Sequence, residues 1–156
     1  MQNSCIQNID GVSLKLKAPF DFGFICRYGR VFKVFDAQDS GNICFGVTAD
    51  NGKRYFVKFA GAPTAEYDGI VADAVERLKA TVPVYMDLAH LMLIRFVKAE
   101  EAGGGYAIVF DWIDAICALG MYPEDYKAFR RLPLETMRHI FADILEFQRV
   151  LPSADM

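Results

Sequence analysis

Lys58 is the residue of this sequence whose surroundings best suggest chemistry. It belongs to the run YFVKFA at residues 55–60, in which strand alternation places it on the same face as apolar side chains. A lysine on an apolar face needs a partner. Glu76, on a helix that follows, can supply a carboxylate, and Glu66 is the alternative if that helix begins earlier. An ammonium held in this way is a compact positive charge suited to contact phosphate groups, although a solvated lysine that protects a strand edge is the simpler interpretation.

The elements that must position Lys58 follow from the hydrophobic pattern. Short aromatic and β-branched runs separated by turn formers predict strands, and the pair Asn51-Gly52 predicts a tight hairpin within an antiparallel meander. The period then changes to three and four, which predicts a helix from Ile70 to about Pro83 with Asp68 capping its first turn. The predicted strands are 30–35, 43–48, 54–59, 91–98 and 106–113, with residues 100–105 as the link between the last two, and the last third of the chain is predicted to be helical. This order predicts an α+β fold with an antiparallel sheet.

The same order of elements resembles a known superfamily. A turn, a strand with Val57-Lys58, a helix with a glutamate, the H-x-x-L-I segment at 90–94 and the run IVFDW at 108–112 resemble the small lobe of the protein kinase-like superfamily. This superfamily includes protein kinases and the aminoglycoside and choline phosphotransferases. The resemblance covers about residues 28–152, and the order and spacing of short motifs carry it. It implies a lead-in segment 1–27, a kinase-like lobe 28–113 with a five-stranded antiparallel sheet and one long helix, and the hinge and first helices of a truncated large lobe at 114–156.

The resemblance also implies a site for ATP. In that superfamily the lysine of the third strand pairs with the helix glutamate and with the α- and β-phosphates, and Lys58 and Glu76 are the matching positions. The remaining implied contacts are Phe110 at the back of the adenine pocket, the backbone of Asp111, Trp112 and Ile113 as the hinge that binds the adenine edge, and Asp114 at the ribose.

Ser40, Gly41 and Asn42 stand where the superfamily covers the phosphates. They lack the G-x-G-x-x-G pattern and are similar to the serine- and asparagine-containing loops of small-molecule kinases, whose turn amides can face phosphate oxygens. A plain hairpin turn is the simpler interpretation. The segment 28–33 imitates a glycine loop, but it would leave an extra strand before Lys58. Asp21-Phe22-Gly23 spells the metal-binding D-F-G, yet it precedes the hinge instead of following it, so we interpret it as an apolar strand or lead-in segment.

The implied function is binding of ATP with Mg²⁺ for phosphoryl transfer to a Ser/Thr hydroxyl of a protein or to a small-molecule hydroxyl. The superfamily's H-x-D-x-x-x-x-N loop supplies the base and a metal ligand, and no such pattern occurs before the sequence ends at Met156. We therefore expect no catalysis by this chain alone and assign no catalytic or metal-binding residue. The alternative is a non-catalytic kinase-like interaction module that does not bind nucleotide. A truncated large lobe would also expose the apolar side of the last helix, which predicts self-association.

Composition narrows the remaining classes. The 156 residues are 53% hydrophobic and 24% charged, as expected of one folded domain, and a net charge of -3 disfavours nucleic acid as a partner. The scattered Cys5, Cys26, Cys44 and Cys117 contain no C-x-x-C pair, which predicts reduced structural thiols. No apolar run is long enough to span a bilayer and no signal-peptide pattern begins the sequence, so we expect a cytoplasmic protein without membrane partners.

Overall fold

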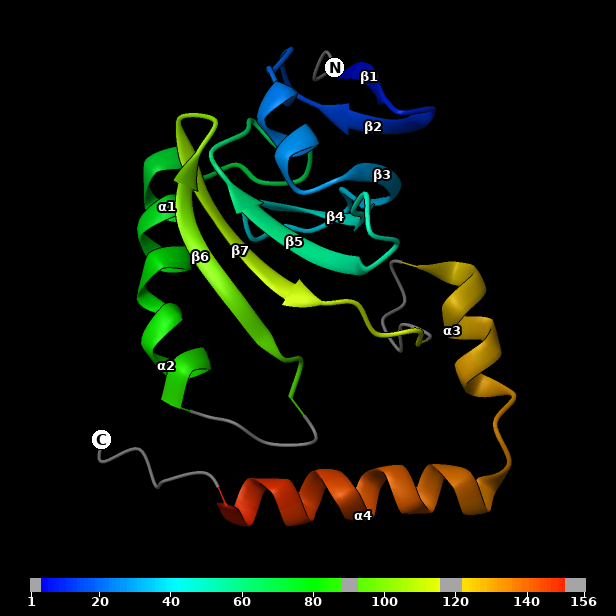
Figure 1. The fold of residues 1–156 in the computed structure, drawn as a ribbon. Helices are drawn as coiled ribbons and strands as arrows, with labels where there is room; N and C mark the ends of the chain where they lie inside the picture. Colours follow the sequence, from blue (N-terminus) through cyan, green and yellow to red (C-terminus); the bar gives the residue numbers. More distant parts are fainter. Residues whose placement is uncertain (1–3, 88–92, 116–121, 151–156) are drawn as a thin grey trace. The chain divides into compact units, whose positions relative to one another are not determined.

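The computed structural model describes residues 4–87, 93–115 and 122–150 (Figure 1). The chain forms two compact units, Met1–Ile113 and Asp114–Met156. The first unit contains a five-stranded antiparallel sheet and several helices, which confirms the α+β class predicted from the sequence. The strands of this sheet lie in the order β3-β4-β5-β7-β6, and their bounds are Arg30–Phe35 (β3), Asn42–Thr48 (β4), Arg54–Ala60 (β5), Phe96–Ala102 (β6) and Gly105–Asp111 (β7).

The first three strands form the predicted meander. β3 pairs with β4 and β4 with β5, both antiparallel, and β5 is the central strand of the sheet. Gly52 adopts a φ of +79° in the turn between β4 and β5, and the side-chain oxygen of Asn51 accepts a hydrogen bond of 2.9 Å from the Lys53 N–H. The Asn-Gly pair therefore makes the hairpin for the reason that predicted it.

The second hairpin differs from the prediction. The strand expected at 91–98 begins only at Phe96, while residues 88–92 lie outside the described residues, and the strand continues through the two glutamates at 100 and 101. The link is only Gly103-Gly104, with φ of +54° and +74°. Such a two-residue turn needs positive φ at both central positions, and glycine accepts it without steric cost. The acidic residues were wrongly predicted as part of the link, because both belong to β6 and pair in register with β7.

The predicted helix is two helices. α1 spans Val71–Ala80 and α2 spans Val82–Asp87, which places Pro83 in the first turn of α2. α1 buries Ala74 and Leu78 against one face of the sheet. The predicted cap is wrong, because α1 has Ile70 at its N-cap without a side-chain hydrogen bond, and the Asp68 carboxylate instead accepts a hydrogen bond from Lys17.

The N-terminal segment covers the opposite face of the sheet (Figure 1). β1 (Cys5–Ile9) and β2 (Val12–Leu16) form a hairpin, and the 3-10 helix η1 spans Gly23–Arg27. Of the two interpretations of Asp21-Phe22-Gly23, an apolar strand or a lead-in segment, the strand is wrong: these residues lead into η1, and the Asp21 carboxylate accepts a hydrogen bond of 2.8 Å from the Gly23 N–H. Apolar residues from this segment join those of the sheet in one core, among them Leu14, Leu16, Phe22, Ile25, Phe45, Val57 and Phe59.

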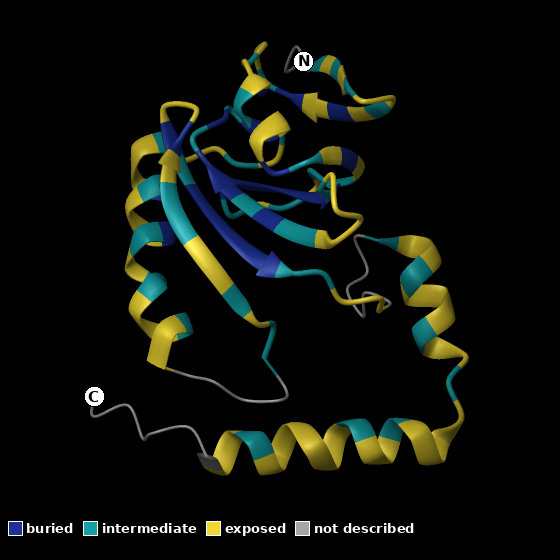
Figure 2. Ribbon diagram, viewed as in Figure 1, coloured by how far each residue is buried: buried dark blue, intermediate teal, exposed yellow. Residues whose placement is uncertain are grey.

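The second unit is helical where it is described. α3 spans Pro123–Arg130 and α4 spans Leu134–Val150, as the helical pattern predicted. Figure 2 shows that most of α4 is exposed, and its exposed apolar side chains are Leu134, Phe141, Ile144 and Leu145. None of the helices in residues 4–87, 93–115 and 122–150 combines the length and apolar character needed to cross a membrane.

Candidate functional site

Lys58 lies on the face of the sheet that α1 partly covers. Cross-strand pairing and alternation bring eight side-chain positions to this face, which we call the Lys58 face: Asn42, Cys44, Gly46, Phe56, Lys58, Ala60, Ile108 and Phe110. The placement of Lys58 beside Phe56 and Ala60 agrees with the strand alternation predicted from the sequence. Because β5 is central, the face continues to either side of Lys58.

The ammonium of Lys58 has an unusual environment. The residue is half-buried, its register partners are Cys44 and Ile108, and it forms no ion pair with any carboxylate in the part of the chain that the structure describes. Burial raises the pKa of the Cys44 thiol to about 12, and the nearby positive charge of Lys58 acts in the opposite direction. Lys58 thus lies on the central strand of the sheet without a carboxylate partner among the described residues.

Neither predicted glutamate partners Lys58. Glu76 is exposed and lies 3.4 Å from the Lys79 ammonium on the outer side of α1. It follows the buried Ala74 by two positions, about 200° around the helix, and therefore points away from the sheet. The predicted Lys58–Glu76 pair is wrong for this reason. The alternative partner Glu66 lies 3.9 Å from the Lys15 ammonium instead.

The turn Ser40-Gly41-Asn42 lies at one end of the Lys58 face. Asn42 is only 7% exposed, and its side-chain nitrogen donates a hydrogen bond of 2.9 Å to the Ser40 hydroxyl. Its side-chain oxygen is buried without a hydrogen-bond partner among the described residues. A buried polar atom without a hydrogen-bond partner costs free energy, and no described contact of this oxygen offsets that cost.

An aromatic cluster lies at the other end of the face and consists of Phe32, Phe35, Phe56 and Trp112. The rings of Phe32 and Trp112 meet edge to face with centroids 4.9 Å apart, and those of Phe35 and Phe56 lie 5.8 Å apart. Gly46 makes room for the first pair, because a Cβ there would lie 2.8 Å from both rings. Phe32 remains 38% exposed, so the cluster presents aromatic surface to solvent.

Phe110 occupies a different position. It is 1% exposed and packs among the rings of Phe56, Tyr85 and Phe96 in the core beneath α1 and α2. It therefore forms the buried wall behind the aromatic cluster and offers little surface of its own. Its predicted place at the back of an adenine pocket stays a prediction.

The first two residues of the predicted hinge, Asp111 and Trp112, make structural contacts, and Ile113 does not share them. The Asp111 carboxylate accepts a hydrogen bond from Arg95 and lies 3.1 Å from the Lys53 ammonium. The hydrogen bond from Arg95 is the main reason that the pKa of this carboxyl lies below its ordinary value, and Lys53 adds to the effect. These contacts tie the ends of three chain segments together.

The main-chain donors of the hinge are also partly used. The Asp111 N–H donates to the Arg95 carbonyl at 3.0 Å, and the Trp112 N–H donates to the Arg54 carbonyl at 3.2 Å. Ile113 follows the end of β7, and its main chain has no hydrogen bond to another described residue. Of the three predicted hinge residues, Ile113 is thus the one whose N–H no other described residue accepts. Asp114 belongs to the second unit.

The histidine, cysteine and acidic side chains are the remaining candidates for chemistry, because they could bind a metal ion. The structure contains no group of three or more His, Cys, Asp or Glu side chains that could hold a metal ion within residues 4–87, 93–115 and 122–150. The three described cysteines are free thiols, while Cys117 and the H-x-x-L-I histidine, His90, lie outside the described residues.

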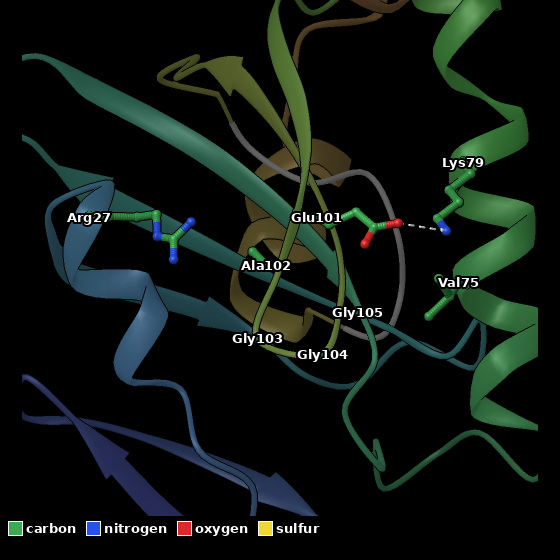
Figure 3. Close-up of a pocket in the computed structure, with 8 residues that line it drawn as sticks. All are labelled: Arg27, Val75, Lys79, Glu101, Ala102, Gly103, Gly104 and Gly105. Carbon is green, nitrogen blue, oxygen red and sulfur yellow. Dashed lines mark hydrogen bonds and ion pairs between the residues drawn. The ribbon is translucent and has the colours of Figure 1, made fainter.

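A separate cavity of about 420 Å³ lies at the turn between β6 and β7 (Figure 3). Figure 3 shows Arg27 on one side of this turn and the pair of Lys79 and Glu101, 3.1 Å apart, on the other. Cross-strand pairing of Ala60 with Tyr106 and of Tyr55 with Asp111 places the turn at the opposite end of the sheet from Trp112. None of the predicted site residues lines this cavity.

No protein-family model, no curated protein and no solved structure matches this chain. The kinase-like resemblance therefore rests on the order of residues and elements. Two residues that matter to the site were not singled out from the sequence, namely Gly46 and Arg77. Gly46 stands inside an otherwise apolar strand, which is a recognised sign of close approach by another group.

Proposed function

We propose that this chain is the nucleotide-binding part of a kinase-like phosphotransferase and that it binds ATP on the Lys58 face. One observation carries the proposal: a half-buried lysine without a described carboxylate partner lies between an aromatic cluster and a polar turn. The order of these groups along the face suits a ligand with an aromatic base at one end and phosphates at the other. The order of strands and helix around Lys58 is the order on which the resemblance depends.

Each part of the ligand has a counterpart on this face. The base would stack on the exposed aromatic surface beside Trp112, with the main chain of Ile113 at its polar edge. The phosphates would lie against the Lys58 ammonium and reach the Ser40 hydroxyl and the Asn42 amide. Mg²⁺ would arrive with the phosphates, because it is usually bound through few protein ligands together with phosphate oxygens and water.

Phosphoryl transfer is a separate matter from binding. In the 156-residue sequence no aspartate is followed five positions later by an asparagine, so the pattern that supplies the base and a metal ligand is not present. We therefore expect ATP binding without transfer by this chain alone. Incubation with ATP and candidate hydroxyl acceptors should yield no phosphorylated product, and measurable transfer by the purified chain would contradict this expectation.

The binding test uses the single tryptophan of the chain, Trp112. Mg-ATP should change its fluorescence with the same midpoint that calorimetric titration gives, in the micromolar to low-millimolar range. Lys58→Met should weaken binding by about tenfold, because it removes a charge-assisted contact to phosphate. Lys15→Met is the matched control, since it removes a strand lysine that lies on β2 and pairs with Glu66. It should leave the affinity for ATP unchanged.

The alternative, an interaction module that does not bind nucleotide, predicts a different result. Neither heat nor a fluorescence change would then appear in the wild type or in Lys58→Met up to several millimolar Mg-ATP. The wrong prediction of a Lys58–Glu76 pair favours this alternative, because it removes one contact on which the resemblance relied. Binding that Lys58→Met weakens and Lys15→Met does not would exclude it.

Self-association through α4 stays a prediction. The helix exposes Phe141 at 57% and Leu145 at 61%, which is apolar surface of the kind that pairs with a second copy. Light scattering should show a mass above that of the monomer as the concentration rises, and Leu145→Glu should restore the monomer. A strict monomer at high concentration would count against this interface.

A further inference from the structure

The turn between β3 and β4 packs directly against α1. Gly41 adopts a φ of +76°, and a Cβ at this position would lie 2.7 Å from the Ala74 Cβ and 2.8 Å from the Tyr67 ring. No side chain fits between the turn and the helix without a shift of one of them. Ser40, Gly41 and the first turns of α1 therefore lie in close contact.

Arg77 links the helix to this turn. Its guanidinium donates a hydrogen bond of 3.3 Å to the Ser40 carbonyl and one of 2.8 Å to the Tyr67 hydroxyl, and it lies 5.3 Å from the centre of the Tyr67 ring. Tyr67 is itself anchored, because the Lys17 ammonium donates a hydrogen bond to its carbonyl and another of 2.6 Å to Asp68. The guanidinium thus bridges α1, the turn and an anchored loop.

The position of this turn decides where the polar groups of the Lys58 face lie. Asn42 directly follows the turn, is buried, and is tied to the Ser40 hydroxyl by the hydrogen bond from its side-chain nitrogen. It pairs with Ala60, one alternation step from the pair of Cys44 and Lys58. A shift of Ser40 would therefore move the hydroxyl and the Asn42 amide relative to the Lys58 ammonium.

We propose that Arg77 is a positioning residue that couples α1 to the phosphate side of the Lys58 face by holding the turn Ser40–Asn42. The role in ligand binding rests on the proposed nucleotide site, whereas the hold on the turn does not. Glu76 points away from the sheet, whereas the neighbouring Arg77 bonds to the turn at this end of the face. Arg77 acts on Ser40 and Asn42 and does not itself touch the nucleotide.

The test compares Arg77→Gln with Lys79→Gln. Both residues lie on α1, and both have side chains that bond to neighbouring elements, but Lys79 faces Glu101 and the Tyr106 ring on the other flank of the helix. Hydrogen exchange of the backbone amides at 40–42 should be about tenfold faster in Arg77→Gln, because the bonds that hold the turn are lost. Lys79→Gln should leave exchange at these amides unchanged.

Binding provides the second measurement. Arg77→Gln should weaken ATP by about tenfold and leave adenosine unchanged, because only the phosphate side of the face is displaced. Tyr67→Phe keeps the ring but removes the hydroxyl, so its effect on both measurements should be smaller than that of Arg77→Gln.

The outcomes separate the two proposals. If exchange at 40–42 is the same in Arg77→Gln as in the wild type, Arg77 does not hold the turn and the inference is overturned. Faster exchange with equal loss of ATP and adenosine affinity also overturns the coupling, because the effect would then be general. If the wild type binds no ATP, the proposed function fails, while faster exchange in Arg77→Gln alone still supports the hold on the turn.

Discussion

The two faces of the five-stranded sheet are covered to different extents. One face is closed by the N-terminal hairpin and η1, and its large side chains, such as Phe45 and Phe59, are fully buried. The Lys58 face is covered only in part, by α1 over β5 and β7 and by α2 next to β6, and Figure 2 shows intermediate exposure next to the buried core strands. Phe32 and Lys58 lie in the part that these helices leave accessible.

The difference shows which features folding requires. On the closed face each apolar side chain has found apolar partners, which is the normal outcome of core packing. The Lys58 face instead carries a cation without a described carboxylate partner, a buried Asn42 oxygen without a described hydrogen bond, and a strand glycine that yields space to two rings. The Asn42 oxygen in particular has a cost in stability that no described hydrogen bond offsets.

The largest effect is expected from deletion of residues 1–27. This segment was predicted as a lead-in, but it contributes Leu14, Leu16, Phe22 and Ile25 to the core. Burying each such side chain stabilises the fold by about 1.5–3 kcal/mol, so their joint loss is comparable with the whole stability of a small domain. The truncated chain should show no cooperative thermal unfolding by circular dichroism. A variant that lacks only residues 1–3 should unfold like the full chain, and a cooperative transition in both would show that the closed face does not need its cover.

Gly46→Val tests the aromatic end of the Lys58 face. The new side chain would collide with the rings of Phe32 and Trp112, so the free energy of unfolding should fall by about 1–3 kcal/mol. The fluorescence maximum of Trp112 should shift, because its ring is displaced. Chemical denaturation followed by this fluorescence measures both effects.

A double substitution supplies the control for this prediction. Phe32→Ala removes one of the two rings, so it should make Gly46→Val less costly than in the wild type. Additive effects of the two substitutions would mean that the ring contacts at Gly46 are not the cause of the loss.

Much of the sheet could be predicted from local sequence. The strands β3, β4 and β5 follow from alternation, and Asn51-Gly52 fixes their hairpin. The hairpin of β1 and β2 was missed, although Asp10-Gly11 has the same signature and both residues adopt positive φ. Its strands have only five residues each, but β2 (VSLKL) alternates apolar with polar residues, so the sequence carried the signal.

The site was predictable only in part. Strand alternation predicts the face of the sheet on which Lys58 lies, but it does not predict which residues contact the Lys58 ammonium. Glu76 could have been rejected from the sequence, because the period that places Ala74 and Leu78 on the sheet places Glu76 on the other side. The link from Arg77 to Ser40 joins residues 37 positions apart and depends on how α1 packs, which no local pattern encodes.

Asp111→Asn tests whether the hinge carboxylate is structural. The hydrogen bond from Arg95 lowers its pKa in the folded state, so the stability it provides is present above the ordinary pKa and is lost as the pH falls through the lowered one. The wild-type Tm should therefore fall more steeply below about pH 4 than that of Asp111→Asn. At neutral pH the variant should melt a few degrees lower. Equal pH profiles for both would show that the contact with Arg95 does not stabilise the fold.

The smallest effect on stability is expected for Lys58→Met, which gives the sharpest contrast between the faces. Because no described carboxylate pairs with the ammonium, its removal should change the free energy of unfolding by no more than about 0.5 kcal/mol. Denaturation in urea measures this value on the same samples that are titrated with Mg-ATP. A loss well above this value would show that the fold itself uses the charge, and the Lys58 face would then resemble the closed face. A stable variant with weakened ATP binding would assign the lysine to the ligand.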